Sequence, residues 1–255
     1  MVDPILLTGV RVCTYQQDQL LTNASGFFFQ RDEHLFLVTS AHVVHAESSG
    51  HFPDRLEIEL HTDPSNLALS TGFSIPLYRD GEGLWRQGVD SAGEVDMAAI
   101  EIDRSALPEN TLFHAFTPKH LPDPAEPIEV GSSLLVVGFP LGFHDTLHHM
   151  PVVRRAVLAS AFGLRFQGEG YFLTDARTHR GTSGAPVVMR MQNPEKEIED
   201  LPWRLLGVHS SRIDVGSRDG NMDEALGLNC AWYADILMSL TLTSNPTEEP
   251  ERLTD

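Results

Sequence analysis

The chain is poor in cysteine. Its 255 residues include only Cys13 and Cys230, and both lie in apolar runs that read as strands. So few cysteines argue against a disulfide-stapled scaffold. Neither residue stands in the Gly-x-Cys-Gly context of a cysteine nucleophile. We interpret both as buried thiols, with a single disulfide between them as the alternative.

The chain is also poor in basic residues, and it lacks long apolar runs. Only 18 Lys and Arg stand against 36 Asp and Glu, a formal net charge of −18 at pH 7. This charge argues against nucleic acid and anionic membrane surfaces as partners. No run reaches membrane-spanning length, and residues 1–5 lack the basic region and long apolar core of a signal peptide. We expect a cytoplasmic protein.

What the sequence does contain is a series of short alternating or apolar runs separated by turns, which predicts an all-β protein. A hydrophobic content of 41% is sufficient for a substantial core. Only residues 233–240 have the spacing of a helix, and the acidic tail at 245–255 is predicted to be disordered. The predicted strands are 9–15, 26–30, 35–39, 56–60, 73–77, 97–102, 133–138, 155–161, 171–174, 185–189, 205–209 and 227–231.

One motif suggests chemistry. Residues 178–186 read Thr-His-Arg-Gly-Thr-Ser-Gly-Ala-Pro and precede an apolar run. Glycines around Ser183 are typical of a nucleophile on a tight turn. Gly181 can adopt the positive φ that aims its N–H and that of Ser183 at one point, which makes an oxyanion hole. An ordinary turn is the alternative for this motif taken alone.

Two upstream segments supply partners for this serine. His42 follows the apolar run 35–38 and is surrounded by small residues, where a surface histidine is unexpected. Asp96 opens the strand-like run that ends at Ile102, so we expect a largely desolvated carboxylate. A buried carboxylate needs a partner, and an imidazole N–H is a good one.

The order His42, Asp96, Ser183 is that of the chymotrypsin-like class. The segments TSAHVV, VDMAAIEI and GTSGAPVV resemble the histidine, aspartate and serine blocks of the bacterial trypsin-like serine peptidases. The resemblance covers nearly the whole chain. It implies two six-stranded antiparallel β-barrels with a short C-terminal helix. Residues 1–110 would carry His42 and Asp96, and residues 111–244 would carry Ser183 and the substrate pocket.

The resemblance and the chemistry imply the same mechanism. Ser183 attacks the scissile carbonyl, His42 takes its proton and returns it to the leaving amine, and Asp96 holds the imidazole tautomer. This predicts a cofactor-free serine endopeptidase that acts on proteins or peptides. Two alternatives stay open. One is a catalytically silent binding module on the same fold, and the other is an esterase or acyl transferase with the same triad.

The substrate pocket is predicted from residues before the nucleophile and from the run 205–212. By resemblance, Ser210, Ser211 and Arg212 form the edge that pairs with the substrate main chain. Trypsin has an acidic residue six positions before its serine, whereas this chain has Arg177. Thr178 and His209 resemble the threonine and histidine of glutamyl endopeptidases and of viral Gln-cleaving proteases. We expect cleavage after Glu, with Gln or Asp next. A strand histidine satisfied by a neighbour is the alternative for His209.

Two other features have simpler interpretations. The run 138–143 has the wrong spacing for a phosphate-binding loop, so we interpret it as a turn after a strand. His144, Asp145, His148 and His149 share one short loop with no cysteine. We interpret them as a solvated loop rather than a metal site.

Overall fold

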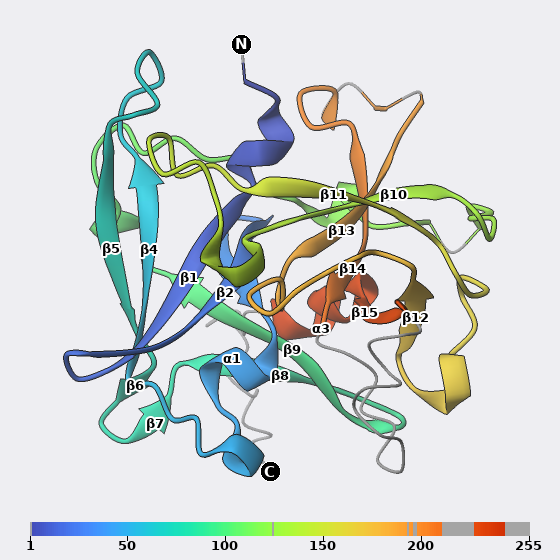
Figure 1. The fold of residues 1–255 in the computed structure, drawn as a ribbon, viewed down its shortest axis with the longest axis horizontal. Coiled ribbons are helices and arrows are strands. Elements are labelled where there is room, and N and C mark those ends of the chain that lie inside the picture. The colour runs from blue at the N-terminus through green and yellow to red at the C-terminus, as the bar shows by residue number, and fades with distance from the viewer. Residues whose placement is uncertain (1, 124, 193, 196–197, 211–226, 243–255) are drawn as a thin grey trace, which may run out of the picture.

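The computed structural model describes residues 2–123, 125–192, 194–195, 198–210 and 227–242. Two antiparallel β-sheets make up most of it (Figure 1). The first sheet has the order β5-β4-β1-β2-β3-β9-β8 and the second has the order β11-β10-β13-β14-β15-β12. Strands β6 and β7 form a separate hairpin. No helix among the described residues is long and apolar enough to cross a membrane.

The first sheet and the hairpin contain β1 (Gly9–Gln16), β2 (Gln19–Arg31), β3 (His34–Thr39), β4 (Arg55–His61), β5 (Ser70–Pro76), β6 (Tyr78–Arg79), β7 (Glu82–Gly83), β8 (Trp85–Asp90) and β9 (Gly93–Ile102). The second sheet contains β10 (Ser133–Gly138), β11 (Val152–Val157), β12 (Tyr171–Thr174), β13 (Pro186–Arg190), β14 (Trp203–His209) and β15 (Asn229–Tyr233). The α-helices are α1 (Ala41–Val44) and α3 (Leu237–Leu240). The 3-10 helices are η1 (Pro4–Leu7), η2 (Glu47–Ser49), η3 (Arg104–Ala106), η4 (Pro118–His120), η5 (Pro140–Gly142), η6 (Phe166–Gly168) and η8 (Ala234–Ile236).

The prediction of six strands in each half is wrong for the first sheet, which has seven. After β5 the chain makes the β6–β7 hairpin and then continues as β8, which pairs with β9 rather than with β4. Strands β5 and β8 therefore lie at the two edges, and a cleft of about 660 Å³ is lined by residues of β5, β8 and β9. The first sheet is a half-barrel. The second sheet has the predicted six strands, and a bridge from Leu158 to Thr174 brings its edges together.

The predicted helix at 233–240 is present in shortened form. Tyr233 ends β15, and the chain then turns through η8 before α3 completes the C-terminal helix. The predicted division at residue 110 stays a prediction. The acidic tail at 245–255 lies outside the described residues.

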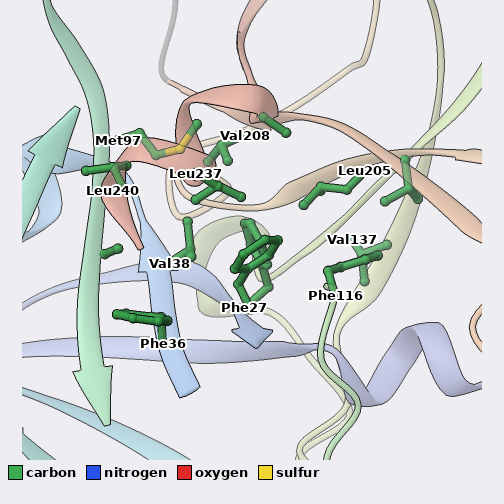
Figure 2. Close-up of a cluster of buried hydrophobic side chains, with 14 of the residues drawn as sticks. Phe27, Phe36, Val38, Met97, Phe116, Val137, Leu205, Val208, Leu237 and Leu240 are labelled. Atoms are coloured by element: carbon green, nitrogen blue, oxygen red, sulfur yellow. The ribbon is translucent and has the colours of Figure 1, made fainter. Parts of the chain in front are cut away.

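The core explains why the strand sequences are apolar on both faces. Leu35 and Leu37 of β3 pack in a cluster inside the first sheet, whereas Phe36 and Val38 pack in a different cluster. The cluster that contains Phe36 and Val38, which we call the shared core, joins the two halves (Figure 2). In it Phe27 meets Phe116 edge to face at 5.6 Å, and Val137, Leu205 and Val208 of the second sheet complete the contact. Alternating side chains of a strand point to opposite faces, so a strand buried twice must be apolar throughout.

Candidate active site

His42 and Asp96 are brought together by the pairing of two neighbouring strands. Thr39, the last residue of β3, lies opposite Ala98 of β9. His42 comes three residues after Thr39 in α1, and Asp96 comes two residues before Ala98. Because the strands are antiparallel, both positions lie at the same end of the pair.

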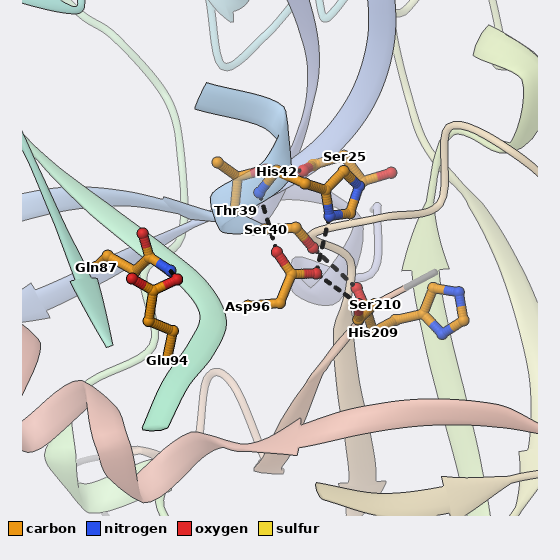
Figure 3. A network of polar contacts seen from close by, with 9 residues as sticks. All are labelled: Ser25, Thr39, Ser40, His42, Gln87, Glu94, Asp96, His209 and Ser210. Carbon is orange, nitrogen blue, oxygen red and sulfur yellow. Dashed lines mark hydrogen bonds and ion pairs between the residues drawn. The ribbon is translucent and has the colours of Figure 1, made fainter. Parts of the chain in front are cut away.

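The two side chains are joined by a direct hydrogen bond (Figure 3). His42 Nδ1 lies 2.8 Å from Asp96 Oδ2, and the His42 backbone N–H donates to Asp96 Oδ1 at 2.9 Å. The hydroxyl of Ser210 also donates to Asp96 Oδ2, at 2.5 Å. Burial raises the pKa of Asp96, but the hydrogen bonds and charge of His42, with the Ser210 hydroxyl, outweigh it and keep the pKa below its ordinary value. An ionised Asp96 only accepts, so His42 carries its proton on Nδ1 and leaves Nε2 as a base.

Ser183 lies in the turn that precedes β13. Its carbonyl accepts the backbone N–H of Ser25 at 2.9 Å, and the N–H of Gly184 donates to the carbonyl of His209 at 2.8 Å. Gly184 has a φ of 85°, and a Cβ there would lie 2.1 Å from the Ser25 carbonyl oxygen. Only glycine fits this position. No hydrogen bond joins Ser183 to His42 in the described part of the chain.

The carbonyl groups of this turn accept hydrogen bonds, either from other segments of the chain or from within the turn. Arg180 O accepts from Leu141 N at 2.5 Å, and Gly181 O accepts from the Ser25 hydroxyl at 2.8 Å. Thr182 O accepts from Ala185 N at 3.0 Å. A trans peptide directs its C=O and N–H to opposite sides, so these bonds also fix the N–H groups.

Two of the N–H groups left without a backbone or side-chain acceptor in the described part of this turn belong to Gly181 and Ser183. Gly181 has a φ of 89°, and a Cβ there would lie 2.7 Å from Phe139 O. Backbone donors left unpaired in a folded turn are available to a ligand oxygen. An oxyanion hole needs such unpaired donors.

The predicted pocket residues differ in their exposure and in their contacts. Arg177 is exposed to solvent. Thr178 is half-buried, and its hydroxyl donates to Asn229 Oδ1 at 2.7 Å. His209 is only 2% exposed, and in Figure 3 its ring points away from the His42–Asp96 pair. Burial lowers the pKa of His209 to about 4, so its imidazole is neutral at pH 7. The remaining predicted pocket residues, Ser211 and Arg212, lie outside the described part of the chain.

Polar groups gather on one face of β12, β14 and β15. His209 lies opposite Ala231, and Thr174 lies opposite Asn229. Directly paired residues share a face, and so do residues two apart in a strand. The side chains of Thr174, His209 and Asn229 therefore share one face. Thr174 Oγ1 and His209 Nδ1 are buried without a hydrogen-bond partner among the described residues.

Three contributions were not predicted from the sequence. Asn229 contacts Thr178, and its polar side chain in the otherwise apolar strand β15 could have indicated a role. Ser210 was predicted as a strand edge, yet its hydroxyl reaches Asp96. Ser25 contacts the nucleophile turn although it lies 156 residues from Gly181 in the chain. No local signal in the sequence marks that contact.

Comparison with known proteins assigns the chain to a family. The family described as "Trypsin-like peptidase domain" matches residues 24–193, more than half of the chain. The chain belongs to this family. Its matched region contains Ser25, His42, Asp96 and Ser183. A comparison with curated proteins finds no match.

Two solved structures are similar to this chain. The serine endoprotease from Yersinia pestis matches with a TM-score of 0.52 and 15% identity, over 92% of this chain and 61% of that one. The active form of the Rv3671c protease from M. tuberculosis matches 93% of this chain and 82% of its own, with 17% identity and a TM-score of 0.49. This trypsin-like peptidase chain therefore spans less than two thirds of the Yersinia enzyme. The first likeness supports a chymotrypsin-like fold and, at this identity, nothing further.

The described residues give little support for a metal site or for a reactive cysteine. No group of three or more His, Cys, Asp and Glu side chains among them is placed to hold a metal ion. In the histidine-rich loop, His148 pairs with Asp145 at 2.7 Å and His144 contacts the carbonyl of Gly142. Burial raises the pKa of Cys230 to about 12, which keeps this thiol protonated.

Proposed function

We propose that this trypsin-like peptidase domain is a serine endopeptidase in which Ser183 is the nucleophile. The observation that carries the proposal is the turn around Ser183, whose carbonyls are held and whose Gly181 and Ser183 N–H groups have no acceptor among the described residues. A donor pair fixed in this way stabilises a developing oxyanion without reorganising during the reaction. The family membership supports protein substrates.

The reaction follows from the charges and donors of these groups. His42 Nε2 accepts the Ser183 proton as the hydroxyl attacks the scissile carbonyl, and the carbonyl oxygen turns toward the N–H groups of Gly181 and Ser183. Asp96 stabilises the imidazolium through the 2.8 Å hydrogen bond. His42 then protonates the leaving amine, and water hydrolyses the acyl-enzyme by the same steps in reverse.

Active-site labelling tests this proposal. The wild-type chain should react with a fluorophosphonate probe at Ser183 and should cleave peptides. Ser183→Ala should lose both activities, and Ser239→Ala, which removes an exposed serine of α3, should lose neither. Labelling without peptide cleavage would indicate an esterase instead. Absence of labelling in the wild type would refute a catalytic Ser183 and favour a binding module.

We further propose a preference for Glu or Gln on the acyl side of the scissile bond. Thr178, Asn229 and His209 offer polar groups at the predicted pocket, and two buried atoms of its polar face lack partners. Unpaired buried groups favour a substrate side chain that can bond to them. Arg177 is exposed and His209 is neutral, so neither supplies a buried charge. This favours the amide of Gln at least as much as the carboxylate of Glu.

A peptide library tests the preference separately from the activity. His209→Ala should lower cleavage after Glu and Gln by roughly 10- to 100-fold, the loss of about one good buried hydrogen bond. The same variant should change the rate of labelling by a small fluorophosphonate much less. Cleavage mainly after aliphatic, aromatic or basic residues would refute the pocket assignment and leave the triad assignment intact.

A further inference from the structure

Ser25 of β2 holds the nucleophile turn of the other half of the molecule. It is fully buried, and two of its hydrogen bonds reach the turn directly. Its backbone N–H donates to Ser183 O at 2.9 Å, and its hydroxyl donates to Gly181 O at 2.8 Å. The same hydroxyl accepts from Phe139 N at 2.9 Å. Its carbonyl accepts from the Thr39 hydroxyl at 2.8 Å.

The hydroxyl therefore connects two segments that each fix part of the turn. On one side it fixes the carbonyl of Gly181. On the other it fixes Phe139, which begins the segment whose Leu141 N–H holds the carbonyl of Arg180. The peptide between Arg180 and Gly181 carries the Gly181 N–H, one of the two proposed oxyanion donors. Its direction depends on the Leu141 bond, because C=O and N–H of one peptide point to opposite sides.

We propose that the side chain of Ser25 is a positioning residue for the oxyanion hole. This inference rests on the proposed function, since it assigns Ser25 to the chemistry at Ser183. Ser25 does not touch the reacting atoms. It acts by holding the Gly181 carbonyl and the Phe139 N–H, so that the N–H groups of Gly181 and Ser183 stay directed at one point.

The Ser25 hydroxyl lies in a tightly packed region. A Cβ built on Gly138 would lie 2.7 Å from the Ser25 hydroxyl oxygen and 3.0 Å from the Ala185 Cβ. Replacement of Ser25 by alanine would leave one carbonyl and one N–H unpaired in a tightly packed region. Buried groups without partners tend to rearrange toward other partners. Here rearrangement would rotate the Gly181–Thr182 peptide, which lies between the two peptides that carry the oxyanion donors, and would release Phe139, whose segment holds the Arg180 carbonyl through Leu141.

Ser25→Ala tests the proposal, with Thr8→Val as the matched control. Thr8 is also fully buried and donates its hydroxyl to a single carbonyl, that of Ile5, at 2.8 Å. We expect Ser25→Ala to lower kcat and the fluorophosphonate labelling rate by roughly 10- to 100-fold, less than the loss of an entire oxyanion donor. KM should change by less than about 3-fold, because substrate binding uses other groups. Thr8→Val should lower the melting temperature and leave both rates unchanged.

A crystal structure of Ser25→Ala gives a readout that does not need activity. We expect the Gly181 or Arg180 carbonyl to change direction. Wild-type labelling rates in Ser25→Ala, or a turn with unchanged carbonyl directions, would overturn the positioning role. Failure of the wild type itself to label would instead refute the proposed function, and the crystal structure would still decide whether Ser25 holds the turn.

Discussion

Two buried histidines should make the stability of the fold depend on pH. Burial lowers the pKa of His209 and of His120 to about 4 in each case, against an ordinary value near 6.5. Both side chains are at most 3% exposed, so solvent screening is small. Each imidazole is neutral in the folded chain and becomes protonated on unfolding below about pH 6.5. Acid therefore stabilises the unfolded state.

The magnitude follows from the two pKa values. Between pH 7 and pH 5, each histidine should remove about 2 kcal/mol from the free energy of unfolding, and the loss should continue to about pH 4. His120→Gln removes one of the two contributions. Glutamine keeps an acceptor for the N–H of Thr117, which His120 Nδ1 accepts at 2.9 Å in the folded chain.

Urea unfolding at several pH values measures this effect. The free energy of unfolding of His120→Gln should fall by about 2 kcal/mol less than that of the wild type between pH 7 and pH 5. Val188→Ala, in the shared core, should lower stability equally at each pH and keep the wild-type slope. Equal slopes for the wild type and His120→Gln would refute the argument that burial keeps His120 neutral.

Three further predictions concern the site and its frame. Asp96→Asn should lower kcat by about 10⁴-fold with little change in stability, because it removes the carboxylate that sets the His42 tautomer; steady-state kinetics and thermal melting measure both effects. Gly184→Ala should prevent folding or lower the melting temperature strongly, since its Cβ would lie 2.1 Å from Ser25 O; a melting temperature near that of the wild type would contradict this packing. Arg165→Ala should cost no more than about 1 kcal/mol in urea unfolding, although Arg165 pairs with Asp90 at 2.7 Å, because the arginine side chain is 37% exposed and exposed pairs contribute little.

The strands could be predicted where their burial leaves a pattern in the sequence. Each predicted strand overlaps a strand of the structure. Burial on two faces gives continuous apolar runs such as Leu35–Val38, and burial on one face gives the alternation of β4. Strand β8 was missed for the opposite reason. It is an edge strand in which only Gly88 is buried, so its sequence carries neither an apolar run nor a clean alternation. The count of six strands in the first half was wrong as a result.

The candidate site was predictable where its residues stand beside local signals. His42 follows an apolar strand, Asp96 stands just before the apolar run of β9, and Ser183 lies between glycines whose positive φ the structure shows. The contact between Ser25 and Gly181 had no such signal, because only folding brings these positions together. The same holds for the bond between Thr178 and Asn229, which joins a loop to a strand 51 residues later.

These contacts explain why the site needs both halves of the molecule. The first half supplies His42 from α1 and Asp96 from β9, and the second half supplies the turn with Ser183 before β13. Each half also holds the other, since Ser210 of the second half bonds Asp96, and Ser25 of the first half bonds the turn. The shared core fixes the distance over which these bonds must reach. A hydrogen bond weakens steeply with misalignment, so a small shift between the halves would loosen the base and the oxyanion donors together. The polar contacts at the site therefore depend on apolar packing that lies outside it.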